Sequence, residues 1–219
     1  MRIARVAGQT LTPEEARAVD AWCAENDVAC AYFLATSADA PTAQVAEEAG
    51  YRLMDVRVEL AQQLDGAESA SPLREARPED HARLRAIARA SHDATRFYAD
   101  PNFPDDGCDR LYETWIDRSL DGWAEAVLVA ERDGVPAGYC SCHLDAASGS
   151  IGLIAVAESA RRQGIGLELA SGAVQWCAAN GARTISVVTQ GRNVAALSTF
   201  QRAGFLVAAV DLWFHKWYR

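Results

Sequence analysis

The segment from Val156 to Leu167, VAESARRQGIGL, holds the residues most suited to ligand chemistry. It is expected to run from a strand end through a short loop into a helix, where free backbone N–H groups and the helix dipole favour an anion. Gly164 and Gly166 let a pyrophosphate approach the backbone, and Arg161 and Arg162 add positive charge. The lysine of a P-loop and the first glycine of G-x-G-x-x-G are both missing.

That local charge matters because the whole chain is acidic. The 219 residues carry 21 Lys+Arg against 30 Asp+Glu, a formal net charge of -9, and Lys216 is the single lysine. Such a balance gives no general attraction to nucleic acid or to an anionic membrane. We therefore expect neither as a partner.

The elements around this segment are predicted from periodicity and turn residues. Strands are expected at 126–131, 137–144, 151–156, 184–189 and 205–217, and helices at 164–180 and 193–202. A helix should also begin near Pro78. This order predicts an α+β fold with a mixed sheet. The polar stretch 61–71 is interpreted as a linker that separates residues 1–70 from residues 71–219.

The two parts share a sequence pattern at an offset of 154 residues. Trp22-Cys23 matches Trp176-Cys177, and Gly50-Tyr51 falls on Gly204-Phe205 without a gap. We interpret residues 1–70 as a truncated copy of the helix-strand-helix-strand unit that ends the chain. Chance similarity of two amphipathic helices is the alternative.

The segment from Val156 to Leu167 resembles the Arg/Gln-x-x-Gly-x-Gly/Ala loop of the Gcn5-related N-acetyltransferases (GNAT). A second mark of that family is matched by Asn193, Ala196 and Gly204-Phe205. The resemblance implies a GNAT-like mixed sheet flanked by helices over residues 73–219, with acetyl-CoA as acyl donor. It implies a splayed gap between the strands at 150–156 and 184–189, with a β-bulge in the earlier strand. The cofactor-binding residues it implies are Ile154, Ala155, Val156, Arg161, Arg162, Gln163, Gly164, Ile165, Gly166, Leu167, Asn193 and Phe200.

Within that family the chain is most similar to the TDP-fucosamine N-acetyltransferases, which acetylate a nucleotide-linked amino sugar. The similarity lies in the truncated first copy and in short motifs such as Thr95-Arg96-Phe97-Tyr98 and Trp217-Tyr218-Arg219. It implies an acceptor site at Arg96, Tyr98, Tyr112 and Trp115. Core packing of a helix pair is the alternative interpretation of the aromatic residues, and a peptide or other small amine is the alternative acceptor.

Proton transfer is the point where the chain departs from the family pattern. The family's usual tyrosine is Phe200 here, which cannot protonate a leaving thiolate, so an acyl-CoA-binding module without catalysis is a further alternative. His143 is the candidate catalytic residue, and Tyr139 shares its strand face. A structural role for His143 is the competing interpretation.

Composition and cysteine spacing complete the expectations. The six cysteines are predicted to be buried thiols, and Cys140-Ser-Cys142 lacks the spacing of a zinc site, so no metal is expected. No apolar run reaches the length of a signal or membrane segment. The prediction is a cytoplasmic enzyme with a small-molecule amine as acceptor and a homodimer as a candidate oligomeric state.

Overall fold

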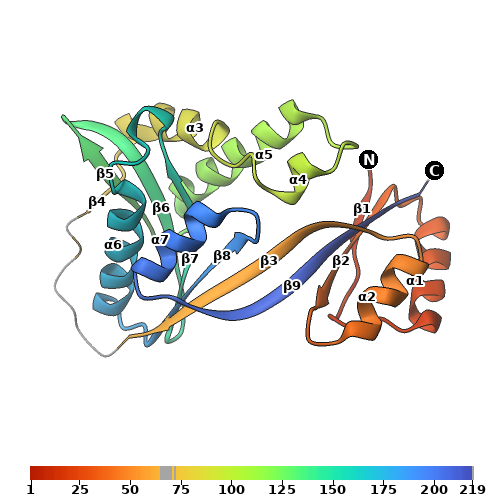
Figure 1. The fold of residues 1–219 in the computed structure, drawn as a ribbon. Coiled ribbons are helices and arrows are strands. Elements are labelled where there is room, and N and C mark those ends of the chain that lie inside the picture. The colour runs from red at the N-terminus through yellow and green to blue at the C-terminus, as the bar shows by residue number, and fades with distance from the viewer. Residues whose placement is uncertain (65–70, 72, 219) are drawn as a thin grey trace. The chain divides into compact units, whose positions relative to one another are not determined.

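The computed structural model describes residues 1–64, 71 and 73–218 (Figure 1). The chain forms two compact units. The first contains residues 1–58, 190–192 and 209–219, and the second contains residues 59–189 and 193–208. The first unit therefore combines the beginning of the sequence with its end, whereas the sequence predicted two consecutive parts divided near residue 70.

The first unit is a small sheet with two helices. Its elements are β1 (Ile3–Arg5), α1 (Pro13–Glu25), β2 (Cys30–Thr36), α2 (Ala40–Glu48), the first part of β3 (Arg52–Gln63) and the last part of β9 (Leu206–Trp217). The strand order is β1-β2-β9-β3, with β1 parallel and β9 antiparallel to β2. Thr12 and Glu15 form a capping box that starts α1.

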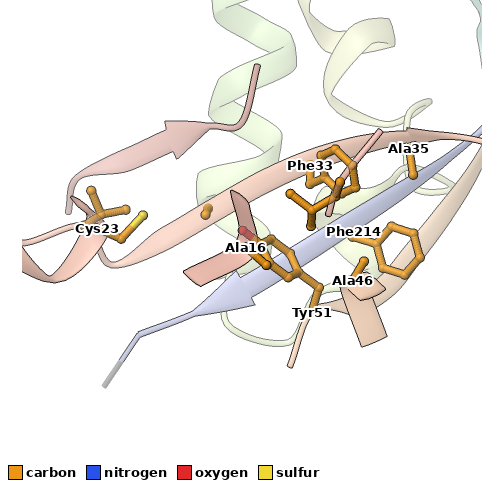
Figure 2. Packing of buried hydrophobic residues seen from close by; sticks show 10 residues of the cluster. Ala16, Cys23, Phe33, Ala35, Ala46, Tyr51 and Phe214 are labelled. Carbon is orange, nitrogen blue, oxygen red and sulfur yellow. The ribbon is translucent and has the colours of Figure 1, made fainter. Parts of the chain in front are cut away.

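Aromatic side chains fill the core of this unit (Figure 2). Phe33 of β2 lies edge-on to Tyr51, with ring centroids 6.1 Å apart, and stacks on Phe214 of β9 at 6.4 Å. The fully buried Ala46 of α2 belongs to the same cluster, as does Cys23 of α1. Because Phe214 comes from the end of the chain, this core needs β9.

The second unit carries a mixed sheet between two layers of helices. Its further elements are β4 (Arg74–Glu75), α3 (His81–Arg89), α4 (Arg96–Ala99), α5 (Asp105–Arg118), β5 (Ala126–Arg132), β6 (Val135–Asp145), β7 (Ser148–Val156), α6 (Ile165–Ala179), β8 (Thr184–Gln190) and α7 (Val194–Arg202), with short helical turns at Pro78–Asp80, Ser119–Trp123 and Glu158–Ala160. The strand order is β3-β8-β7-β6-β5-β4. Neighbours from β4 to β7 pair antiparallel, and β7 pairs parallel with β8. The predicted α+β class with a mixed sheet is confirmed.

Alternation along β6 assigns the two faces of this sheet. Cys140 Sγ contacts the carbonyl oxygen of Leu169 in α6 at 3.6 Å. Tyr139, its neighbour, points to the opposite face, where its hydroxyl lies 3.4 Å from His92 Nε2 just after α3. Helix α6 therefore covers one face of β6, and the α3 region covers the other.

The predicted linker is partly wrong. Strand β3 continues to Gln63, so residues 61–63 are strand. Its neighbour in the second unit is β8. Leu64 extends the contact, since its N–H donates to the carbonyl oxygen of Arg183 at 2.9 Å. Residues 65–70 and 72 of the predicted linker, and Arg219 of the C-terminal motif, lie outside the described residues.

The element bounds support the proposed duplication. Strand β2 begins at residue 30 and β8 at residue 184, 154 residues later, and the same offset relates both ends of α2 to α7 and of β3 to β9. Left-handed backbone recurs at that offset in Gly50 and Gly204, with φ of 84° and 97°. The side-chain amides of Asn26 and Asn180 both donate to a tryptophan carbonyl four residues earlier. We retain the truncated first copy as a proposal that these matches support.

Candidate active site

Strands β7 and β8 separate within the sheet. Their parallel register covers residues 148–151 and 184–187, ending at Ile151 opposite Val187, although both strands continue. Next to this point, β7 places Gly152 and Leu153 opposite the single residue Ser141 of β6, which is a β-bulge. Ser141 Oγ accepts a hydrogen bond from the Leu153 N–H at 2.8 Å. Both the expected bulge and the expected separation are present.

Beyond the bulge, β7 directs backbone donors away from β6. The Ala157 N–H donates to the carbonyl oxygen of Ala137 at 2.8 Å, and Val156 is the partner of Gly138. Because antiparallel pairs alternate, the N–H groups of Ile154 and Val156 point to the β8 side. Val188 of β8 is 44% exposed along this stretch. An extended, partly apolar ligand could therefore pair with β7 here.

The loop after β7 presents a helix N-terminus. Arg162 and Gly164 have positive φ values of 64° and 80°, which turns the chain sharply into α6. The first α6 hydrogen bonds run from the Leu167 and Glu168 N–H groups to the Gly164 carbonyl oxygen, at 3.1 and 3.0 Å. The N–H groups of Ile165 and Gly166 precede these bonds and are available to an anion.

The loop side chains take different directions. Arg161 Nη2 lies 3.5 Å from the carbonyl oxygen of Ala90, at the end of α3, and Gln163 Nε2 lies 3.4 Å from the carbonyl oxygen of Ser159. Arg162 is exposed. A pocket of about 490 Å³ opens beside this loop, lined by α3 and by residues 157–159. Arg161 is thus directed to α3, and the anion site predicted for this loop depends on the loop backbone.

Helix α7 supplies Asn193 and Phe200. Asn193 caps the helix, with Oδ1 accepting from the Ala196 N–H at 3.1 Å. Phe200 is only 2% exposed and packs edge-on against Phe205, with centroids 5.9 Å apart. The phenyl ring is buried in the second unit, and its contact with acetyl-CoA stays a prediction.

The predicted acceptor residues are brought together by α4 and α5. Tyr112 is buried, donates to Thr95 Oγ1 at 2.9 Å and lies edge-on to Trp115 at 5.3 Å. The Tyr98 hydroxyl donates to Asp109, and burial together with this bond raises the pKa of Tyr98. The Arg96 guanidinium lies 4.2 Å from the centroid of the Phe97 ring. Tyr112 therefore packs as a core residue, whereas Arg96, Tyr98 and Trp115 retain exposed surface.

The sequence did not predict His92 to be a site residue. Its ring stacks on Tyr112, with centroids 4.3 Å apart, and Nε2 lies 3.4 Å from the Tyr139 hydroxyl. Its neighbour Ser91 places Oγ 3.5 Å from the carbonyl oxygen of Val156. Burial lowers the pKa of His92 to about 4, so the imidazole is neutral near pH 7. The sequence showed no sign of this contact, because His92 lies in the loop after α3 and Tyr139 is 47 residues away.

We expect His92 to make the protein sensitive to acid. A lowered native pKa means that the unfolded chain binds the proton first, so stability falls as the pH drops from about 6.5 to 4. Because the ring retains some solvent contact, the loss from this group is about 1 to 3 kcal/mol. His92→Phe, which preserves the stacking on Tyr112, should lose less stability than the parent between pH 7 and pH 4.5 in chemical denaturation. Equal losses would contradict a buried neutral imidazole.

His143 lies on the same face of β6, farther along the strand. Its Nδ1 is 3.9 Å from Glu125 Oε2, and its ring is edge-on to Trp123, with centroids 5.0 Å apart. A side chain on Gly152 would collide with this imidazole, since a Cβ there would be 2.5 Å from Nε2. His143 thus borders the bulge of β7, and its catalytic role stays a prediction.

All of the predicted site residues belong to the second unit. Residues 77–205 match the acetyltransferase (GNAT) family model, which covers more than half of the chain. The chain therefore belongs to the acetyltransferase (GNAT) family and is an acetyltransferase. Members of this family use acetyl-CoA as co-substrate.

Two curated proteins are similar to it in sequence. A dTDP-fucosamine acetyltransferase from Escherichia coli O6:H1 is 29% identical over 173 residues, covering 78% of this chain and 74% of the relative. The spore coat polysaccharide biosynthesis protein SpsD from Bacillus subtilis is 26% identical over 147 residues, covering 64% of this chain. The match spans about half of SpsD, 48% of its length.

Solved structures show the same fold. A GCN5-related N-acetyltransferase from Sphaerobacter thermophilus matches with a TM-score of 0.67 at 17% identity, over 93% of this chain and 67% of that one. One from Kribbella flavida matches with a TM-score of 0.61 at 20% identity, over 97% and 80% of the two chains. At these identities the likeness concerns the fold alone.

The described residues contain neither a membrane-spanning helix nor a metal-binding cluster. No helix in residues 1–64 and 73–218 has the length and apolar character needed to cross a bilayer. In the same part of the chain, no group of three or more His, Cys, Asp or Glu side chains is arranged to hold a metal ion. All six cysteines are buried free thiols, as predicted.

Proposed function

We propose that this acetyltransferase moves the acetyl group of acetyl-CoA to the primary amine of a nucleotide-linked amino sugar. The observation that carries the cofactor part is the separation of β7 from β8 after Ile151. It leaves the N–H groups of Ile154 and Val156 directed into the gap, just before the Gly164–Gly166 turn. The spacing suits one ligand with an extended arm and a pyrophosphate.

The residues of this segment have distinct roles in the proposal. The backbone of residues 154–156 pairs with the pantetheine arm, and the N–H groups of Ile165 and Gly166 hold the pyrophosphate. Gly166 has no side chain beside these N–H groups. A Cβ there would make an ordinary contact with Thr199, 3.5 Å away, so the space that the glycine leaves free lies next to α7. Binding along β7 runs from the loop back towards the bulge, which brings the thioester close to Gly152.

The reaction itself needs positioning more than covalent help from the protein. The amine nitrogen bonds to the thioester carbonyl carbon, and the carbon–sulfur bond then breaks with its electron pair on sulfur. Backbone N–H groups of β7 stabilise the oxygen that becomes negative in the transition state. His143 is the proposed acceptor of the amine proton. The thiolate can leave unprotonated near neutral pH, which is consistent with Phe200 at the position of the usual acid.

The acceptor class rests on the names of the two curated relatives and on the α4–α5 region. Arg96 offers the planar guanidinium that suits a diphosphate, and Tyr98 and Trp115 offer exposed ring surface to a sugar or base. The E. coli relative is named for a dTDP-linked amino sugar and SpsD for a polysaccharide pathway. Both names favour a sugar acceptor over a peptide.

A panel of amines tests the acceptor class. Thiol release from acetyl-CoA is measured with nucleotide-linked amino sugars, polyamines and peptide amines, and we expect turnover with the first group. Arg96→Ala should raise the KM for the nucleotide-linked sugar about threefold to tenfold and leave acetyl-CoA affinity unchanged. A peptide amine as best substrate would refute the acceptor class. Tight acetyl-CoA binding without turnover of any amine would favour the binding module.

A further inference from the structure

The bulge of β7 changes which residues of that strand bond to β6. Beyond the bulge, the Ala157 N–H donates to the Ala137 carbonyl oxygen, so the odd-numbered residues of β6 direct their backbone groups to β7. Before the bulge, the odd-numbered His143 has the even-numbered Ser150 as its partner. The residues of β7 that bond to β6 therefore change from even-numbered to odd-numbered at the bulge.

The position of the bulge decides which N–H groups face the gap between β7 and β8. With the extra residue opposite Ser141, the N–H groups of Ile154 and Val156 face this gap. A bulge placed two residues farther along β7, opposite Tyr139, would instead turn the Ile154 N–H towards β6. The pantetheine arm would then lose one of its two proposed backbone partners.

The Ser141 hydroxyl supplies an acceptor where the ladder of backbone hydrogen bonds is interrupted. Ser141 is 0% exposed, and its Oγ accepts the Leu153 N–H at 2.8 Å. Since a buried N–H without an acceptor is costly, this bond stabilises the bulge at its present position. The neighbours of Ser141 on the same face of β6, Tyr139 and His143, carry rings, and the Tyr139 hydroxyl is directed to His92. A short hydroxyl suited to the backbone of the adjacent strand therefore lies opposite the bulge.

Gly152 leaves room for this hydroxyl. A Cβ on Gly152 would lie 2.9 Å from Ser141 Oγ, closer than a side-chain carbon and a hydroxyl oxygen can approach. A side chain at this position would therefore push the hydroxyl away from the Leu153 N–H. The first residue of the bulge and the serine opposite it are thus matched, one by lacking a side chain and the other by having a short polar one.

We infer that Ser141 is a positioning residue for acetyl-CoA: its hydroxyl fixes the bulge of β7 and so keeps the N–H groups of Ile154 and Val156 directed to the pantetheine arm. This inference rests on the proposed function, which pairs the arm with residues 154–156. Ser141 has no exposed surface, so it acts on the ligand through β7 rather than by contact. Its effect is confined to the arm, because the pyrophosphate is proposed to bind at the start of α6.

Ser141→Ala tests this role, because it removes the acceptor and adds no atom. We expect the Kd for acetyl-CoA, measured by isothermal titration calorimetry, to rise about fivefold to tenfold. The ligand 3′-phosphoadenosine 5′-diphosphate carries the pyrophosphate of coenzyme A without the pantetheine arm. Its Kd should stay within twofold of the parent value, whereas a general disturbance of the fold would weaken the binding of both ligands.

Ser119→Ala is the matched control. Ser119 is also buried, at 2% exposure, and its Oγ donates to the Trp115 carbonyl oxygen at 2.9 Å, at the end of α5. The substitution therefore removes a comparable serine hydroxyl away from the bulge, and the Kd for each ligand should stay within twofold of the parent value. Thermal melting checks that both variants are folded.

Amide hydrogen exchange, followed by NMR, tests the geometry in the parent protein as well. Without ligand, the Leu153 amide should be protected, and the amides of Ile154 and Val156 should exchange at least tenfold faster. Acetyl-CoA should protect Ile154 and Val156. In Ser141→Ala, the Leu153 amide should exchange at least tenfold faster than in the parent.

The exchange data distinguish failure of this inference from failure of the proposed function. If acetyl-CoA binds and leaves the Ile154 and Val156 amides unprotected, the placement of the arm in the proposed function is wrong. If acetyl-CoA protects them and Ser141→Ala weakens neither ligand, or weakens both equally, the placement stands and the role of Ser141 is refuted. An unprotected Leu153 amide in the parent would also refute that role, whether or not the variant folds.

Discussion

Gly166→Val is expected to weaken acetyl-CoA binding at least tenfold, about 1.4 kcal/mol, while the protein stays folded. The reason is that the valine side chain would stand over the N–H groups of Ile165 and Gly166, where the pyrophosphate is proposed to bind. The fold should survive because a Cβ at this site meets Thr199 only at 3.5 Å. Isothermal titration calorimetry with acetyl-CoA measures the affinity, and thermal melting checks the fold.

A substitution at Gly164 tests pyrophosphate binding less directly than Gly166→Val, because it would also strain the backbone. A Cβ there meets no atom within 4 Å, but φ of 80° makes any side chain strained. Gly8 has the same φ of 80° and equally open surroundings, in the first unit. Gly8→Ala therefore measures the effect of backbone strain alone and should leave acetyl-CoA affinity unchanged.

Unaltered affinity of Gly166→Val for acetyl-CoA would refute the placement of the pyrophosphate.

Gly138→Val should lower the free energy of unfolding by about 3 kcal/mol, more than any other substitution considered above. A Cβ at Gly138 would lie 2.8 Å from the Ala155 carbonyl oxygen, 3.0 Å from Leu169 Cδ1 and 3.1 Å from Ile165 Cγ2. Backbone on one side and two buried side chains of α6 on the other leave no route of relaxation. Strand β6 would have to move from β7 or from α6.

Thermal unfolding provides the measurement for Gly138→Val. For a chain of this size we expect the melting temperature to fall by about 6 to 12 °C. Gly166→Ala is the matched control, since its new methyl group meets only ordinary contacts and should change the melting temperature by less than 2 °C. A similar small change for Gly138→Val would mean that the spacing of β6, β7 and α6 adapts easily.

Local elements were predicted well because their signals are local. The alternation of β6, the helical face of α6 and the glycine turn at Gly164 depend on neighbours within a few residues, and the observed bounds differ from the predicted ones by at most three. Glycine spacing also indicated the exposed N-terminus of α6, because such a turn needs only backbone and absent side chains; anion binding there stays a prediction.

Contacts between distant segments were beyond sequence reasoning. The pairing of His92 with Tyr139 and the approach of Glu125 to His143 depend on how α3 and β5 pack on β6. Phe200 was placed on the cofactor from its position in a motif, whereas its exposure of 2% depends on Phe205 and the surrounding core. The extension of β3 through residue 63 depends on a partner strand rather than on its polar residues.

The membership of β3 and β9 in both units restricts how the gene can be divided. The first unit contains the end of β9, and the second contains the end of β3, so a cut in the stretch 65–70 would leave each fragment without a strand supplied by the other. Each would then expose an unpaired strand edge, which invites aggregation. Residues 71–219 are therefore not a portable module: an exchange with a homologue must carry residues 1–64 as well, because β3 from that segment completes the sheet that holds the catalytic residues.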